Sequence, residues 1–233
     1  MKPVILYALP RTRSSPILYS CKREIKLFEP FGSRHIYREK SNDQAWNFRA
    51  ELNNDFVSSG KWKDMITKMN SINTITKILC IDIFYFSPAR KWFKDSVMNQ
   101  THDVFIIERE NREEILLSYI MAIMFGFHKN SEVESYEFTA DDSILSHLHN
   151  IIDYYLRFYP KQGKIITFEN LPESHFDKSL NTSSYAIDQN SSSKYKYIQN
   201  LDELRGHIKH ILDYYKDEWD SKIRNLDQSD YES

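Results

Sequence analysis

The chain has 233 residues, of which 41% are hydrophobic and 27% charged, with 15 Tyr and 14 Phe, so we expect one packed domain over residues 1–233. The net charge is −2, and the last stretch, residues 213–233, has seven acids against three basic residues, which argues against a broad basic surface for nucleic acid. No apolar run approaches the roughly 18 residues of a membrane span. With two cysteines and no zinc-ligand spacing, we expect a soluble cytoplasmic protein without disulfides or a bound metal.

The first predicted elements are a strand over residues 4–9 and a helix over residues 16–22. The segment Pro10-Arg11-Thr12-Arg13-Ser14-Ser15 lies between them. The N–H groups at a helix start, arginine guanidinium groups and serine hydroxyls are all suited to binding a phosphate or sulfate. The alternative is that the two serines only cap the helix while the arginines are solvated. Because no Gly precedes Gly32, the segment is neither a GxxxxGK[ST] loop nor a GxGxxG loop.

Charge supports the anion-binding interpretation at this end of the chain. Residues 1–40 contain nine Lys or Arg against three Glu. Such a local excess attracts an anion even in a chain that is close to neutral overall.

The rest of the chain alternates between predicted helices and short apolar strands. We expect an irregular loop over 28–40, helices over 43–69 (broken near Gly60), 89–99, 112–125, 141–159 and 201–224, and strands over 77–85, 104–108 and 164–168. A polar, serine-rich stretch at 181–196 is typical of a mobile surface loop, and 226–233 of a flexible acidic tail. This alternation predicts an α/β fold with three layers, a mainly parallel sheet flanked by helices.

A second strand-to-helix junction carries another candidate anion site. Residues 104–108 form an apolar strand, Arg109 follows it, and Ser118 lies nine positions further along the predicted helix. The alternative is a salt-bridged helix start in which Ser118 is merely tolerated.

Together, in this order, the two segments resemble the PAPS-dependent sulfotransferases, in particular the bacterial and phage branch that is similar to trehalose sulfotransferase. PAPS is 3′-phosphoadenosine 5′-phosphosulfate. The 10–15 segment is similar to the loop that holds the 5′-phosphosulfate, although Arg13 stands where that family usually has Gly. Residues 104–119 resemble the segment that binds the 3′-phosphate, and 164–171 resemble a late strand and YEDL segment of the family.

The resemblance implies a P-loop-like sulfotransferase fold and transfer of a sulfuryl group from PAPS, without a metal. The acceptor would be a hydroxyl or amine of a carbohydrate or small metabolite. The residues that the resemblance assigns to PAPS are Arg11, Thr12, Arg13, Ser14, Ser15, Arg109, Ser118 and Lys194. Lys194 lies in the serine-rich loop, where the alternative is a solvated side chain.

Sulfuryl transfer needs a cation for the developing charge and a base for the acceptor proton. We assign the cation to Arg11 and the base to Glu29, within the Glu-Pro-Phe segment that related sequences often carry. His35 is the second candidate base and Glu24 the third. The alternative for Glu29 is an ion pair at the surface with Lys26 or Arg34.

Two other functions remain open. One is a degenerate nucleotide kinase-like protein, disfavoured by the missing Lys-[Ser/Thr] pair. The other is a non-catalytic relative that binds PAPS or its product, which Arg13 in place of Gly favours. The aromatic residues Tyr154, Tyr155, Phe158 and Tyr159 repeat at helical spacing and predict a core face, with stacking on adenine as the alternative.

Overall fold

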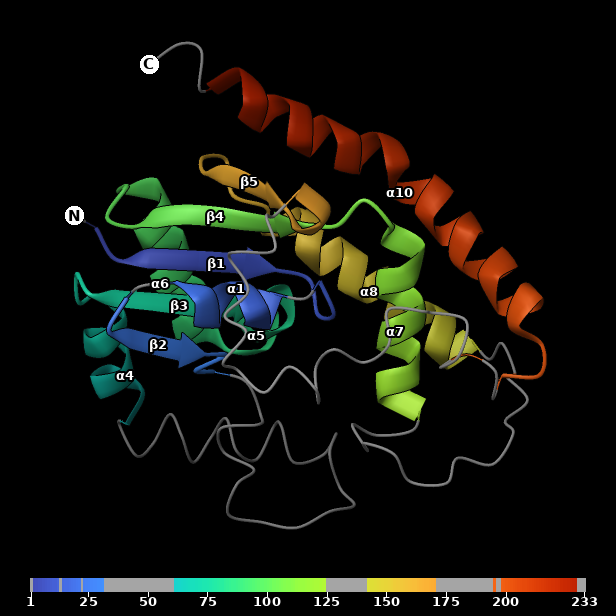
Figure 1. Ribbon diagram of the computed structural model, residues 1–233, viewed down its shortest axis with the longest axis horizontal. Helices are drawn as coiled ribbons and strands as arrows, with labels where there is room; N and C mark the ends of the chain where they lie inside the picture. The colour runs from blue at the N-terminus through green and yellow to red at the C-terminus, as the bar shows by residue number, and fades with distance from the viewer. Residues whose placement is uncertain are drawn as a thin grey trace.

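The fold is that of a computed structural model, which describes residues 2–12, 14–21, 23–31, 61–124, 142–170, 195 and 198–229. Its centre is a five-stranded sheet in the order β2-β3-β1-β4-β5, in which every neighbouring pair is parallel (Figure 1). The strands are β1 (Val4–Ala8), β2 (Ile25–Phe28), β3 (Thr74–Leu79), β4 (Asp103–Glu108) and β5 (Lys164–Thr167). The predicted α/β fold with a parallel sheet is therefore confirmed.

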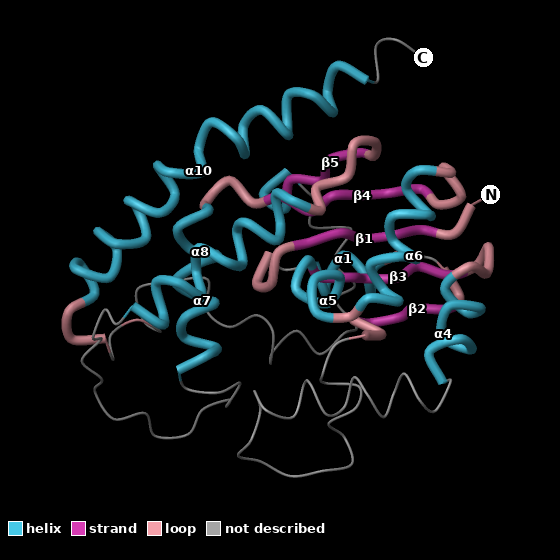
Figure 2. The backbone as a smooth tube through the Cα atoms, turned by 180° about the vertical axis from the view of Figure 1, so that it is seen from behind, coloured by secondary structure: helices cyan, strands magenta, loops and turns pink. Residues whose placement is uncertain are grey.

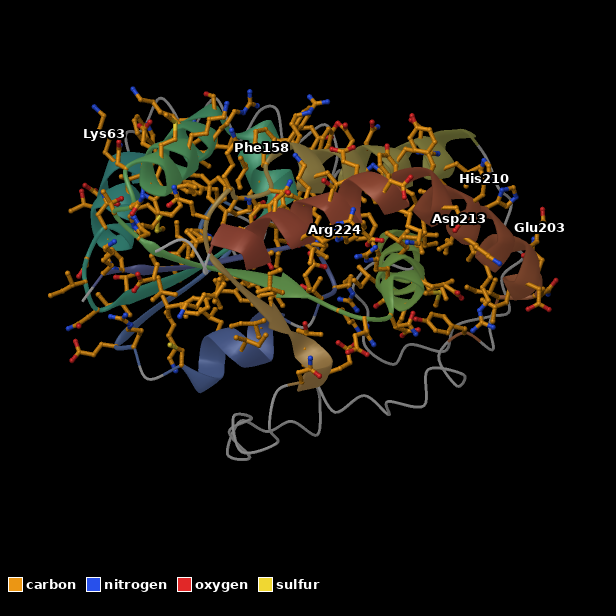
Figure 3. All side chains as sticks on the ribbon, turned by 90° about the horizontal axis from the view of Figure 1, so that it is seen from above. Lys63, Phe158, Glu203, His210, Asp213 and Arg224 are labelled. Carbon is orange, nitrogen blue, oxygen red and sulfur yellow. The ribbon has the colours of Figure 1, made fainter. Side chains whose placement is uncertain are left out.

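Helices cover both faces of this sheet. They are α1 (Ser14–Ser20), α4 (Lys61–Met69), α5 (Cys80–Tyr85), α6 (Ser87–Met98), α7 (Arg112–Met124), α8 (Asp142–Arg157) and α10 (Leu201–Ser229), with a short 3-10 helix, η2 (Phe168–Asn170). In Figure 3 the sheet lies between α1 on one side and α5, α6 and α8 on the other. These are the three layers that the alternating sequence predicts.

The core forms around the central strands. Every residue of β1 and β3 is buried, as expected for strands of a parallel sheet that helices cover on both faces. On the α8 side, Tyr7 of β1 stacks on Tyr155, and its hydroxyl donates to the Tyr155 carbonyl at 2.7 Å. Tyr155 of α8 and the residues Phe158 and Tyr159 just after it are buried, and Tyr154 is partly buried against the core, so the predicted core face is confirmed.

The last helix spans the molecule. α10 has 29 residues, packs against α7 and α8, and runs along one side of the fold (Figures 1 and 2). Despite this length, no helix in the described ranges has the apolar length that crossing a bilayer requires.

Three predicted elements need correction. The predicted strand over 77–85 is instead the end of β3 followed by α5, whose start is capped where the Leu79 N–H donates to the Asp82 carboxylate at 3.3 Å. β2 was not predicted, and the expected loop from residue 28 begins at its last residue. α10 ends at Ser229 rather than at residue 224, and Leu226, at the start of the predicted tail, is buried.

The remaining expectations fall mostly outside the described residues. These include the loop over 32–40, the helical region over 43–60, residues 181–194 and 196 of the serine-rich stretch, and the end of the tail over 230–233.

Candidate functional site

The strand order has a topological switch point between β1 and β4. From β1 the chain continues to β2 on one side, whereas from β4 it continues to β5 on the other. In open parallel sheets, ligands bind outside the carboxyl ends of the strands where such connections diverge. The segments that follow β1 and β4 at this edge contain Arg11 and Arg109, the two arginines singled out in the sequence.

A direct hydrogen bond joins the two candidate anion segments. The Arg11 Nε donates to the Ser118 Oγ at 3.1 Å, although 107 residues separate them. Ser118 is buried on α7. The parallel pairing of β1 with β4, in which Ala8 lies opposite Ile107, brings the two loops to the same edge of the sheet.

Backbone strain is found at two of the predicted functional residues. In the described residues, a positive φ occurs outside glycine at Arg11 (71°), Glu29 (46°) and Gln100 (50°). Side chains other than glycine adopt this left-handed region rarely, and strained backbone clusters at functional sites. Arg11 lies three residues after β1 and Glu29 immediately after β2, whereas Gln100 belongs to the turn that precedes β4.

The hydroxyl residues of the first loop have different roles. The Thr12 Oγ1 donates to the Leu9 carbonyl at 2.9 Å and is buried, so it stabilises the turn itself. Ser14 is also buried, and the Ser15 Oγ accepts a hydrogen bond of 3.0 Å from the Lys77 Nζ. The three other predicted site residues, Arg13, His35 and Lys194, lie outside the described residues.

Lys77 is a buried cation that the sequence reasoning did not select. It lies on β3, and its Nζ is 2.7 Å from the Glu29 Oε1, with side-chain exposures of 6% for Lys77 and 11% for Glu29. The same ammonium lies 4.2 Å from the centre of the Phe28 ring. The signal available in the sequence was a lysine inside an apolar run, because such a residue needs a charged partner when both faces of the strand are covered.

Glu29 is therefore in a buried ion pair rather than in the surface pair with Lys26 or Arg34 that was the alternative. The register places Phe28 opposite Lys77, and the Glu29 N–H donates to the Lys77 carbonyl at 3.0 Å. Glu24, the third candidate base, precedes β2 and accepts a hydrogen bond from Asn73 at 3.1 Å. It thus lies at the opposite edge of the sheet from the first loop, and we withdraw it as a base.

At the second segment, Arg109 is paired with a carboxylate. Its Nε lies 3.3 Å from the Glu169 Oε1, and the backbone N–H of Glu110 donates to the Glu169 Oε2 at 3.1 Å. The register explains the contact, since Glu108 of β4 lies opposite Thr167 of β5 and the following residues stay side by side.

Tyr195 and Glu114 complete this part of the site. The Tyr195 hydroxyl donates to the Glu114 Oε1 at 2.7 Å, and both side chains are buried. Burial raises the pKa of Tyr195, the bond to Glu114 adds to this, and the charges of Arg109 and Arg11 act in the opposite direction. Tyr195 is thus within electrostatic reach of both arginines. Tyr195 was not selected from the sequence, because it lies in a serine-rich stretch predicted to be a surface loop.

The strand that delivers Arg109 ends in a buried carboxylate. Glu108 accepts hydrogen bonds from the Tyr155 hydroxyl at 2.8 Å, the Tyr159 hydroxyl at 3.1 Å and the Trp219 indole at 3.2 Å. Burial raises the pKa of Glu108, and these donors, with Arg112, offset part of that increase. Glu108 thereby attaches α8 and α10 to the strand end beside the site.

Comparisons with known proteins give no match: no protein-family model, no curated protein and no solved structure. Within the described ranges, no group of three or more His, Cys, Asp or Glu residues could hold a metal ion. The geometry of the described residues joins Arg11 to Ser118, holds Tyr195 against Glu114 on the same helix as Ser118, and places Lys77 and Glu29 at the same edge of the sheet.

Proposed function

We propose that the protein is a PAPS-dependent sulfotransferase that transfers a sulfuryl group to a hydroxyl or amine acceptor, a carbohydrate or small metabolite. The observation that carries the proposal is the hydrogen bond between Arg11 and Ser118. It joins the segments that resemble the 5′-phosphosulfate and 3′-phosphate loops, at the edge of the parallel sheet where a nucleotide is expected.

In this proposal, each cation binds one end of the nucleotide. Arg11, with Ser14 and Ser15, holds the 5′-phosphosulfate, while Arg109 and Ser118 hold the 3′-phosphate. Guanidinium groups suit both, because their planar N–H pairs match the oxygens of phosphate and sulfate. The bond between Arg11 and Ser118 opens when the nucleotide binds, and each side chain then contacts its own anionic group.

The chemical step follows from these assignments. The acceptor oxygen attacks the sulfur of PAPS, the bond from sulfur to the phosphate oxygen breaks, and 3′-phosphoadenosine 5′-phosphate (PAP) leaves. Arg11 stabilises the charge that develops on the leaving phosphate. Glu29 accepts the proton of the acceptor hydroxyl, and Lys77, at 2.7 Å, orients that carboxylate. No metal takes part in this scheme.

The test is thermal melting with PAP, which needs no knowledge of the acceptor. At a PAP concentration 100 times its Kd, we expect the Tm to rise by roughly 5–10 °C, because ligand binding to the folded state then adds about 2.7 kcal/mol. Arg109→Ala and Arg11→Ala should each lose most of this rise.

Arg157→Ala is the matched control, because Arg157 forms an exposed ion pair with Asp153 on α8. It should keep the full PAP response. Stabilisation by ATP with Mg²⁺ but not by PAP would instead favour the kinase-like alternative. A PAP response without turnover across a broad acceptor screen would favour a non-catalytic relative.

A further inference from the structure

The side chain of Glu169 is held as a bound oxyanion would be. One carboxylate oxygen lies 3.3 Å from the Arg109 Nε, and the other accepts the Glu110 N–H at 3.1 Å. One positive side chain and one backbone donor therefore engage the two oxygens separately. We call this arrangement of Arg109 and the Glu110 N–H the Arg109 notch.

A phosphate group presents the same pair of acceptors. Two of its oxygens can take the guanidinium and the backbone N–H, and at neutral pH it carries more negative charge than a carboxylate. Glu169 and a phosphate cannot occupy the notch together, because they need the same donors and repel each other.

We propose that Glu169 is an internal competitor that occupies the Arg109 notch until a phosphate monoester displaces it. The inference rests on the proposed function, in which this phosphate is the 3′-phosphate of PAPS. Glu169 thereby lowers the affinity for the nucleotide and helps the product PAP to leave.

The exposure of the pair makes the exchange feasible. The Glu169 side chain is 31% exposed and the Arg109 side chain 13%. A carboxylate with this access to water is hydrated again when it leaves, and the more buried Arg109 exchanges one anionic partner for another, so neither charge is left without compensation. The neighbouring carboxylate, Glu114, is buried and hydrogen-bonded to Tyr195, so it is not the group that leaves.

The experiment compares wild type with Glu169→Gln by isothermal titration calorimetry at fixed ionic strength. The ligands are PAP, adenosine 5′-monophosphate and inorganic phosphate. Glutamine keeps the shape of the side chain and removes its charge, so PAP should bind about 2- to 5-fold more tightly, the equivalent of one exposed ion pair. Adenosine 5′-monophosphate lacks the 3′-phosphate, and its affinity should change less than the affinity for PAP.

Glu113→Gln is the matched control, because it removes the same charge from α7, where Glu113 pairs with Arg205 at 3.1 Å. If Glu113→Gln gained as much affinity for PAP, the effect would come from the general loss of negative charge in this region, and the inference would be overturned. Where wild type binds PAP, the inference would also be overturned if Glu169→Gln bound PAP no better than wild type, or gained equally for both nucleotides. Glu169 would then only position Arg109.

The two proposals can fail separately. If wild type binds PAP and Glu169→Gln is no tighter, the competitor is refuted and the donor site stands. If neither protein binds PAP, the proposed function fails, and tighter binding of inorganic phosphate by Glu169→Gln alone would still support the competitor. Absence of any phosphate binding by both proteins would refute it.

Discussion

Lys77 is the residue that most constrains the region around the predicted base. A lysine buried on a central strand loses its hydration, and the carboxylate of Glu29 compensates for that loss at 2.7 Å. The Ser15 hydroxyl accepts a further hydrogen bond from the same ammonium. One buried charge therefore fixes the end of β2 and the start of α1 with respect to β3.

Removing this ammonium should destabilise the protein strongly. For Lys77→Met we expect a loss of about 3–5 kcal/mol in the free energy of unfolding, because Glu29 is left buried without its counter-charge. Urea denaturation measures the change. The double variant Lys77→Met with Glu29→Leu should recover much of the loss, and failure to recover would show that the pair is not the cause.

Lys216→Met is the control for the effect of burial. Lys216 is also 2.7 Å from its carboxylate partner, Asp220, but its side chain is 63% exposed. Removing it should change the stability far less than removing Lys77.

Residue roles could be predicted from the sequence where they depend on local order. Arg11 and Arg109 each follow an apolar strand, so their place at one edge of a parallel sheet could be inferred without knowing the strand order. Lys77 and Tyr195 could not be assigned, because their partners are far away in the sequence. Glu29 lies 48 residues before Lys77, and Glu114 lies 81 residues before Tyr195. Their contacts depend on β2 lying beside β3 and on the path of the chain after β5.

Among the elements, α10 has a cluster of polar contacts at Trp219 and Asp220. The Trp219 indole donates to Glu108 at 3.2 Å and lies against the Tyr155 ring, with centres 5.4 Å apart. Arg112 covers the same indole at 4.4 Å and pairs with Asp220, one residue further along the helix. The middle of α10 is thus attached to the start of α7 and the end of β4.

Trp219→Phe should loosen this attachment. Loss of the indole N–H leaves Glu108 with fewer donors in a buried position, for which we expect a cost of about 1–3 kcal/mol. Amide hydrogen exchange should rise in α10 near residue 219 more than in α4. Trp62→Phe, a half-buried position on α4, is the control and should leave the exchange of α10 unchanged.

Two of the errors in predicted elements have physical causes that can be named. Residues 77–85 are apolar apart from Lys77 and Asp82, and such a run fits a buried strand or a buried helix equally well. The side chain of Asp82 decides between them by capping α5. β2 has only four residues and is less buried than β1 or β3, so its pattern was too short to distinguish it from a loop.

The stability of the whole molecule depends on pH through two buried titratable groups, one at each end of β4. Their pKa values shift in opposite directions. His102 precedes the strand, and its ring contacts Thr101 at 2.9 Å and the Met69 carbonyl at 3.2 Å. Burial lowers the pKa of His102, whereas burial raises the pKa of Glu108 at the far end. The folded state therefore binds a proton less readily than the unfolded chain at His102, and more readily at Glu108.

These directions determine how stability changes with pH. The contribution of His102 is complete above its unfolded pKa of about 6.5 and is lost as the pH falls below that value. The contribution of Glu108 has the opposite sign: it is present at low pH and is lost as the pH rises from about 4.3, its unfolded pKa, through the higher folded value. Between about pH 4.3 and about pH 6.5 the two contributions change in opposite directions. The pH profile of wild-type stability therefore does not show either contribution by itself.

Two variants separate the contributions. We expect the stability of wild type minus that of Glu108→Gln to fall as the pH rises above about 4.3, and the corresponding difference for His102→Gln to rise towards about pH 6.5. Urea denaturation at half-unit pH steps from 4 to 8 would give both curves, with the exposed Tyr214→Phe as a control that should run parallel to wild type. A Glu108 difference that rises with pH would mean that the carboxylate is stabilised in its charged form. The end of β4 would then be held by a buried charge, as Lys77 and Glu29 hold the end of β2, rather than by a carboxyl group whose charged form burial disfavours.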